Sequence, residues 1–221
     1  MSGPVRVPAS WIKDAEFDPV LEMVAIAGGT FRNTGIPTPS LGSLMLLELC
    51  DNRFFLHPES CSGEELGQAL FLLYSGKSAV AAVVEFIHDR PQKIEEGGKW
   101  AMLKFGDSVI DHYGEFVEWA IELPFYGLAM LPGGGESRDP FIFNAVSVSR
   151  LIYLAAKFGN LTPDEALWKM PLASLGHLIA CGCDAEGVKG VARPKDPEDI
   201  RRQLQAARER EERGEKHPWQ N

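Results

Sequence analysis

The side chains best suited to chemistry in this chain are a few histidines and the acids beside them. His88 precedes Asp89 and Asp111 precedes His112, the two places where these residue types are neighbours. Adjacent residues on a helix point about 100° apart, so neither pair forms a ready-made catalytic dyad or chelate. A metal-dependent hydrolase, the enzymatic alternative for this chain, would need His88, Asp111, His112 and His177 to converge in space.

The other candidate groups favour structural roles. His177 lies within a run of apolar residues, which is typical of a histidine at the edge of a core. The cysteines do not have the paired spacing of a zinc site, so we interpret them as reduced and mostly buried thiols. They are Cys50, Cys61, Cys181 and Cys183.

Catalytic sequence signatures are absent from the chain. It contains no G-x-S-x-G elbow, P-loop, H-E-x-x-H or G-x-G-x-x-G motif. Three glycines at 133–135 lack the lysine and the strand-loop-helix context of a phosphate loop, which favours a connector. We therefore expect a protein that is not an enzyme, with no catalytic residue, cofactor or metal.

The charge distribution bears on partners and location. The formal net charge is −9, and residues 194–221 carry seven side chains of each sign, so the whole excess lies in residues 1–193. An acidic body repels phosphate, so nucleic acid is not an expected partner. We find no signal peptide and no uninterrupted apolar run of about 18 residues, and we expect a cytoplasmic protein without membrane contact.

Apolar residues recur at helical spacing through most of the chain, which predicts an all-α fold, an irregular multi-helix bundle. Residues 1–39 would form an N-terminal arm and first helix, residues 40–187 a helical core domain, and residues 188–221 a linker with a charged helix. The predicted helices span 17–27, 41–51, 63–76, 78–88, 91–123, 141–159, 163–170, 171–185 and 197–214. Pro124 should end the longest of them, and 124–140 should be a loop.

Three hydroxyl residues predict helix starts: Ser40, Ser62 and Thr162, the last two with a glutamate three residues later. The residues Phe54, Phe55 and Leu56 should fold back as an apolar plug. In the helix over 78–88, the apolar residues should face the core. They are Val80, Val83, Val84 and Ile87.

The C-terminal helix over 197–214 is of a different kind. Acids precede bases at i, i+4 spacing along it, and its apolar stripe is thin: Ile200, Leu204 and Ala207. Such a helix cannot bury itself alone. It is either a solvated appendage or a docking helix that binds another chain through these three residues.

Several segments together resemble a known family. A Ser-Leu-Gly-Ser-Leu-Met-Leu-Leu segment at 40–47 precedes the aromatic pair Phe54-Phe55 and an acid-capped helix at 64–71. Much later follows Leu-Thr-Pro-Asp-Glu-Ala-Leu-Trp-Lys-Met-Pro-Leu at 161–172. This order of segments is similar to that of the tail assembly chaperones of tailed phages and prophages.

The resemblance implies a non-enzymatic role in morphogenesis. Such proteins bind the long, apolar tape measure protein and keep it soluble until tail-tube subunits polymerise around it. An exposed apolar groove between helices, or a helix that pairs with the client, would be required. Self-association is also expected, because the client is much longer than one domain. A helical adaptor module, with the C-terminal helix binding its partner, is the other non-enzymatic alternative.

Overall fold

The computed structural model describes residues 19–131, 141–189 and 191 of the chain. Its regular elements within these residues are helical, which confirms the predicted all-α fold class. In chain order they are α1 (Pro19–Ile26), η2 (Phe31–Asn33), α2 (Leu41–Leu49), α3 (Arg53–Leu56), η3 (Pro58–Ser60), α4 (Gly63–Ser75), η4 (Gly76–Ala79), α5 (Val80–Ile87), α6 (Gln92–Ile110), α7 (Tyr113–Val117), η5 (Glu118–Glu122), α8 (Leu123–Ala129), α9 (Ala145–Gly159), η6 (Glu165–Lys169) and α10 (Leu172–Ala185).

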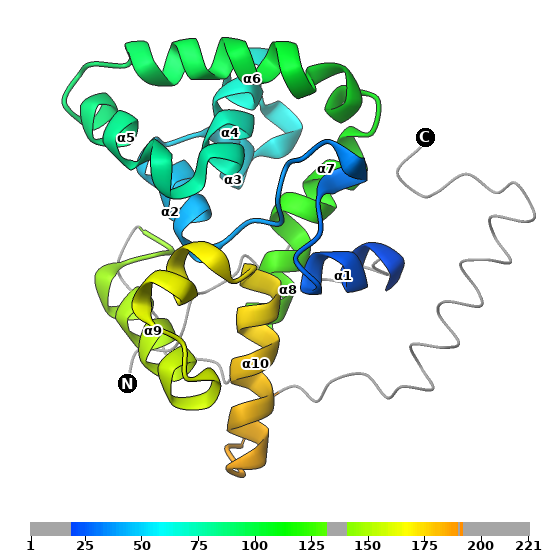
Figure 1. The fold of residues 1–221 in the computed structure, drawn as a ribbon, viewed down its shortest axis with the longest axis vertical. Coiled ribbons are helices and arrows are strands. Elements are labelled where there is room, and N and C mark those ends of the chain that lie inside the picture. The colour runs from blue at the N-terminus through cyan, green and yellow to red at the C-terminus, as the bar shows by residue number, and fades with distance from the viewer. Residues whose placement is uncertain (1–18, 132–140, 190, 192–221) are drawn as a thin grey trace, which may run out of the picture.

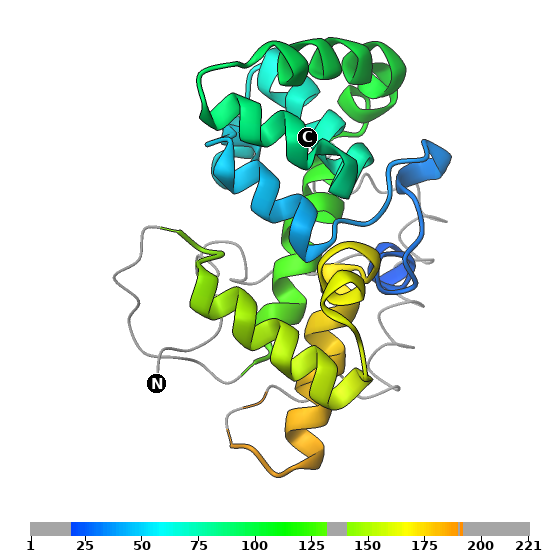
Figure 2. The ribbon, with the colours of Figure 1, turned by 60° about the vertical axis from the view of Figure 1, so that its left-hand side comes forward.

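The helices form two groups joined by a continuous helical column (Figure 1). The upper group holds α4, α5 and α6, with α2 and α3 beneath them, and the lower group holds α8, α9 and α10. The column of α7, η5 and α8 runs from one group to the other, as the view in Figure 2 also shows. Buried residues from both groups form one core cluster, so the two groups share a single apolar interior.

Glycines allow the closest helix contacts in both groups. A Cβ on Gly67 of α4 would lie 2.7 Å from the carbonyl oxygen of Gly98 on α6. A Cβ on Gly176 of α10 would lie 2.3 Å from the carbonyl carbon of Gly127 on α8. No side chain fits at such distances, so glycine at these positions sets how closely the paired helices approach.

Residues 19–39 pack onto the helical core. Ala25, Phe31 and Ile36 are fully buried and belong to the same core cluster as the later helices. The Phe31 ring lies 5.2 Å from that of Phe116 and 6.2 Å from that of Trp119, between centroids. Aromatic pairs at these separations stabilise beyond their buried area.

The predicted helix starts are confirmed by their hydrogen bonds. Ser43 N donates to Ser40 Oγ at 3.2 Å, which caps α2. Glu65 N donates to Ser62 Oγ at 3.2 Å, and Glu165 N donates to Thr162 Oγ1 at 3.3 Å. The plug at 54–56 forms one helical turn, in which Phe54 and Phe55 are buried and Leu56 is exposed.

Several predicted helix boundaries were wrong. The helix predicted over 91–123 is divided, because α6 ends at Ile110 and α7 begins at Tyr113. Pro124 does not end a helix, because it lies inside the continuous column, as the second residue of α8. The π-helical turn η5 directly before it lets the column continue. The helix predicted from Phe141 begins at Ala145, because the Asn144 side chain accepts a hydrogen bond from Ser147 N at 2.9 Å and caps α9 there.

Candidate functional site: an exposed apolar surface

The outer side of α5 is the largest departure from the predicted core. The sequence predicts that Val80, Val83, Val84 and Ile87 face inward, and the structure buries only Val83 of these four. Val84 is 50% exposed and Ile87 is 52% exposed. Helical periodicity predicts one apolar side for a helix. In contrast, α5 has two apolar sides, of which one is buried and the other is exposed. The buried one carries Val83 and Ala82, and Ala79 of η4, directly before α5, is buried beside them.

A groove lies between α2 and the start of α9. It encloses about 250 Å³ and is lined mainly by apolar residues: Met45, Glu48, Leu49, Phe141, Phe143, Asn144 and Ala145. Leu49 and Phe141 remain exposed at its edges. In Figure 1, α5, α2 and the light-green start of α9 follow one another along the left side of the molecule. The α5 face (Val80, Val84 and Ile87) and this α2–α9 groove are the candidate site.

The Glu48 carboxylate holds the groove together. Its oxygens accept hydrogen bonds from Ile142 N at 2.5 Å and from Phe143 N at 2.9 Å. The Phe143 ring stacks on Phe125 at 5.7 Å between centroids and lies 5.9 Å from Phe55. One groove wall is thus fixed to α2 by charge-assisted hydrogen bonds, and its base is fixed in the aromatic core.

Replacing Glu48 by alanine should therefore loosen the groove. The change leaves two part-buried backbone N–H groups without their anionic acceptor, and we expect a loss of about 1–3 kcal/mol in the free energy of unfolding. Thermal unfolding followed by circular dichroism measures it. The matched change Glu64→Ala, at an exposed acid of the first turn of α4, should cost much less. Equal losses in the two variants would contradict this role of Glu48.

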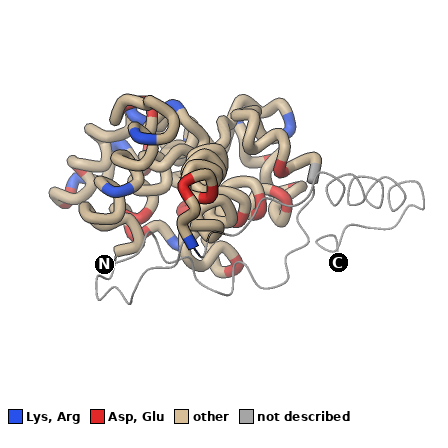
Figure 3. Tube along the Cα trace, turned by 90° about the horizontal axis from the view of Figure 1, so that it is seen from below, with Lys and Arg blue, Asp and Glu red and all other residues tan. Residues whose placement is uncertain are grey.

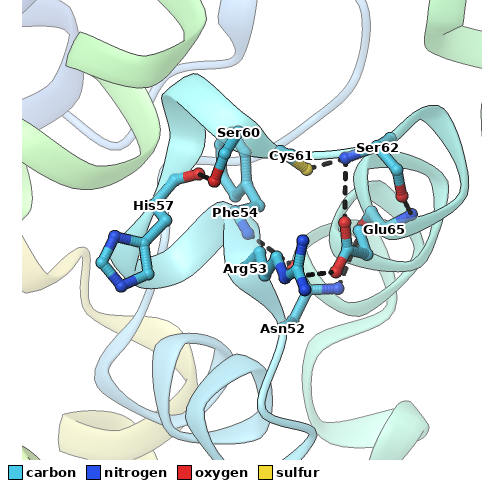
Figure 4. A network of polar contacts seen from close by, with 8 residues as sticks. All are labelled: Asn52, Arg53, Phe54, His57, Ser60, Cys61, Ser62 and Glu65. Carbon is cyan, nitrogen blue, oxygen red and sulfur yellow. Dashed lines mark hydrogen bonds and ion pairs between the residues drawn. The ribbon is translucent and has the colours of Figure 1, made fainter.

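A polar network closes the turn between α3 and α4 (Figure 4). The Glu65 carboxylate accepts a hydrogen bond from Ser62 N at 2.8 Å and lies 3.5 Å from Arg53 Nε. Asn52 accepts from Phe54 N through Oδ1 and donates through Nδ2 to the Glu65 carbonyl, both at 3.0 Å. These contacts join two helix starts, which is a structural role.

Cys61 in this network does not have the properties of a nucleophile. Burial raises the pKa of its thiol to about 11, with a further contribution from Glu65. A reactive cysteine requires the opposite shift, because the thiolate is the attacking species. The four cysteines are free thiols: Cys50 and Cys183 are buried, Cys61 is partly buried and Cys181 is exposed.

The network predicts a specific acid sensitivity. The hydrogen bonds from Ser62 lower the pKa of Glu65 below 4.5, so the ionised carboxylate stabilises the fold. This contribution is present above the unfolded-state pKa and is lost as the pH falls through the lower folded-state pKa. We expect unfolding free energy to fall between about pH 5 and pH 3, and less steeply in Glu65→Gln than in the original chain. Urea unfolding at several pH values tests this, and identical slopes would contradict it.

The structure does not assemble the metal site that the hydrolase alternative would need. His88 lies exposed at the end of α5, and His112 lies beside α7 with its Nδ1 3.9 Å from Glu115 Oε1. His177 is part-buried on α10, and burial lowers its pKa. Within the described residues, no group of three His, Cys, Asp or Glu side chains could hold a metal ion. The arrangement therefore gives the hydrolase alternative no support.

The predicted partner residues of the C-terminal helix, Ile200, Leu204 and Ala207, lie outside the described residues, so their role remains a prediction.

By length and composition, the helical stretch Gly63–Ile87 could cross a membrane, with mean hydropathy 1.6. The sequence prediction treated it as two helices, and the backbone does bend at Gly76, where φ is +50°. Figure 3 shows acidic residues at several places along the described chain.

Sequence reasoning missed the α5 face and the groove for different reasons. The groove could not be found from the sequence, because it depends on the contact of Glu48 with Ile142 and Phe143, which lie 94 and 95 positions later in the chain. For α5, the alanines at 79 and 82 were a usable signal of a second, closely packed side. Comparison with protein-family models, curated proteins and solved structures gave no match.

Proposed function

We propose that this protein is a non-enzymatic morphogenesis protein of the tail assembly chaperone type, which binds an apolar protein client, such as a tape measure protein, and keeps it soluble. One observation carries the proposal: the apolar residues Val80, Val84 and Ile87 are exposed at i, i+4 and i+7 on α5. A row with this spacing matches one face of a helical client. Burying it would remove apolar area from water at about 25 cal/mol per Å².

The α2–α9 groove supports the same function. Its exposed edges, Leu49 and Phe141, provide apolar area on the side of the molecule where α5 lies. A helical client lying along this side would contact elements that are far apart in sequence. Exposed apolar patches of this kind on otherwise soluble proteins mark binding sites.

The proposal predicts a tape measure gene beside the gene for this protein, and the test is co-expression of the two proteins. The proposal predicts that the soluble fraction of the client rises several-fold when this protein is present, and that the two proteins elute together in size-exclusion chromatography. A client that is equally soluble without this protein would contradict the proposal. So would a gene neighbourhood that holds metabolic enzymes and no tape measure gene.

A further inference from the structure

A second exposed surface lies on the outer side of α6, which runs along the top of the molecule in Figures 1 and 2. Leu103 is 91% exposed, the highest value among the large apolar residues of the described chain. Trp100, one turn earlier on the same helix, is 43% exposed. Tyr74 of α4 lies beside Trp100, with 5.4 Å between ring centroids, and is also exposed.

The aromatic rings here are held in place by the core. Phe105 is buried, and its centroid lies 5.1 Å from that of Tyr74 and 5.9 Å from that of Trp100. The two exposed rings are thus ordered before any partner arrives. Tryptophan and tyrosine that are fixed in this way lose little entropy on binding, and they dominate the energetics of many interfaces.

Lys104 completes the cluster, and within the part of the chain that the structure describes it has no acidic partner. Its Nζ lies 4.3 Å from the centroid of the Tyr74 ring, 4.9 Å from that of Trp100 and 4.8 Å from that of Phe105. It also donates to the Tyr74 hydroxyl at 3.3 Å. Cation–π contacts at these distances hold the ammonium in position over the rings.

Four other lysines of the described chain pair with carboxylates. Ion pairs join Lys77 to Asp164, Lys93 to Glu85, Lys157 to Glu186 and Lys169 to Asp164. In the same described residues, no carboxylate lies within 4.0 Å of Lys99 or Lys104, although Glu96 and Asp107 share this exposed side of α6. Two cations without ion-pair partners therefore flank an exposed apolar pair on a protein of net charge −9.

We propose that the surface formed by Tyr74, Trp100, Leu103 and Lys104, here called the α6 surface, binds an amphipathic helix whose apolar side is bordered by carboxylates. Leucines of the partner would cover Leu103 and the Trp100 face. Its carboxylates would pair with Lys104 and Lys99, which have no such partner among the described residues. This surface uses none of the residues of the proposed client site, so the inference does not depend on the proposed function.

The test uses two synthetic helices labelled with fluorescein. In both helices the leucines are spaced alternately three and four residues apart, so that they form one apolar side. The positions that border this side are all glutamate in one helix and all lysine in the other. In anisotropy titrations, the glutamate helix should bind at least about tenfold more tightly than the lysine helix. Leu103→Ala and Trp100→Ala should each weaken the glutamate helix by about tenfold, and Lys104→Gln should reduce the difference between the two helices.

Controls separate this surface from the rest of the protein. Tyr153→Ala, at an exposed residue of α9, should leave binding unchanged. If Trp100→Ala fails to fold, Leu103→Ala still tests the proposal, because the Leu103 side chain is highly exposed and does not contribute to the core. Equal binding of both helices, binding of neither, or normal binding by Leu103→Ala would overturn the proposal. A dimer of the protein alone in sedimentation velocity, lost in Leu103→Ala, would also overturn it by assigning the surface to a second copy.

Discussion

Gly176→Ala is expected to lower the free energy of unfolding by at least about 2 kcal/mol, although alanine is a better helix former than glycine. The new Cβ would lie 2.3 Å from the carbonyl carbon and 2.5 Å from the carbonyl oxygen of Gly127. Both are backbone atoms of α8, so no side-chain rotation can relieve the contact. The two helices would have to separate, and this would open the core that they share.

Urea unfolding followed by circular dichroism measures this loss, and Gly63→Ala is the matched control. A Cβ on Gly63, in the first turn of α4, has no atom within 4 Å. Its stability should be unchanged or slightly higher, because alanine restricts the unfolded chain. A Gly176→Ala variant that is as stable as Gly63→Ala would show that α8 and α10 are not packed as described.

The double change Val84→Glu with Ile87→Glu is expected to weaken client binding by about a hundredfold or more and to leave the fold intact. Both side chains are half-exposed, so the native state does not need them for its core. In a complex they would be buried, and an unpaired carboxylate buried in an apolar interface costs several kcal/mol. Fluorescence anisotropy with a labelled helical fragment of the client measures the effect.

Tyr153→Glu is the control for that experiment. Tyr153 is 65% exposed on α9, so the change adds a charge to an exposed side chain without touching the α5 face. Binding by this variant should stay within about twofold of the original protein. If the α5 double variant binds as well as Tyr153→Glu, the α5 face is not where the client lies.

The fold class and most helix starts could be predicted because they depend on short-range patterns. Ser40, Ser62 and Thr162 each cap a helix through a hydrogen bond three residues away, and sequence shows that spacing directly. Gly76 likewise bends the chain where the prediction ended a helix. Local chemistry determines these features, so they needed no knowledge of the tertiary structure.

The candidate site could not be predicted from such patterns. Which side of α5 is buried depends on the neighbours α2 and α6, and the small side of Ala79, Ala82 and Val83 is the one that packs. The prediction that Pro124 ends a helix failed for a similar reason, since the preceding π-helical turn is not visible in the sequence. Exposure is a property of the assembled fold, and periodicity alone does not give it.

Site-specific photo-crosslinking tests the central claim, that the α5 face contacts an apolar client, most directly. A photoreactive amino acid placed at position 84 or, as a control, at position 153 is irradiated in the presence of the co-expressed tape measure protein. The account predicts a crosslink to the client from position 84 and none from position 153. Crosslinks of equal yield from both positions, or none from position 84 in a complex that elutes intact, would contradict it.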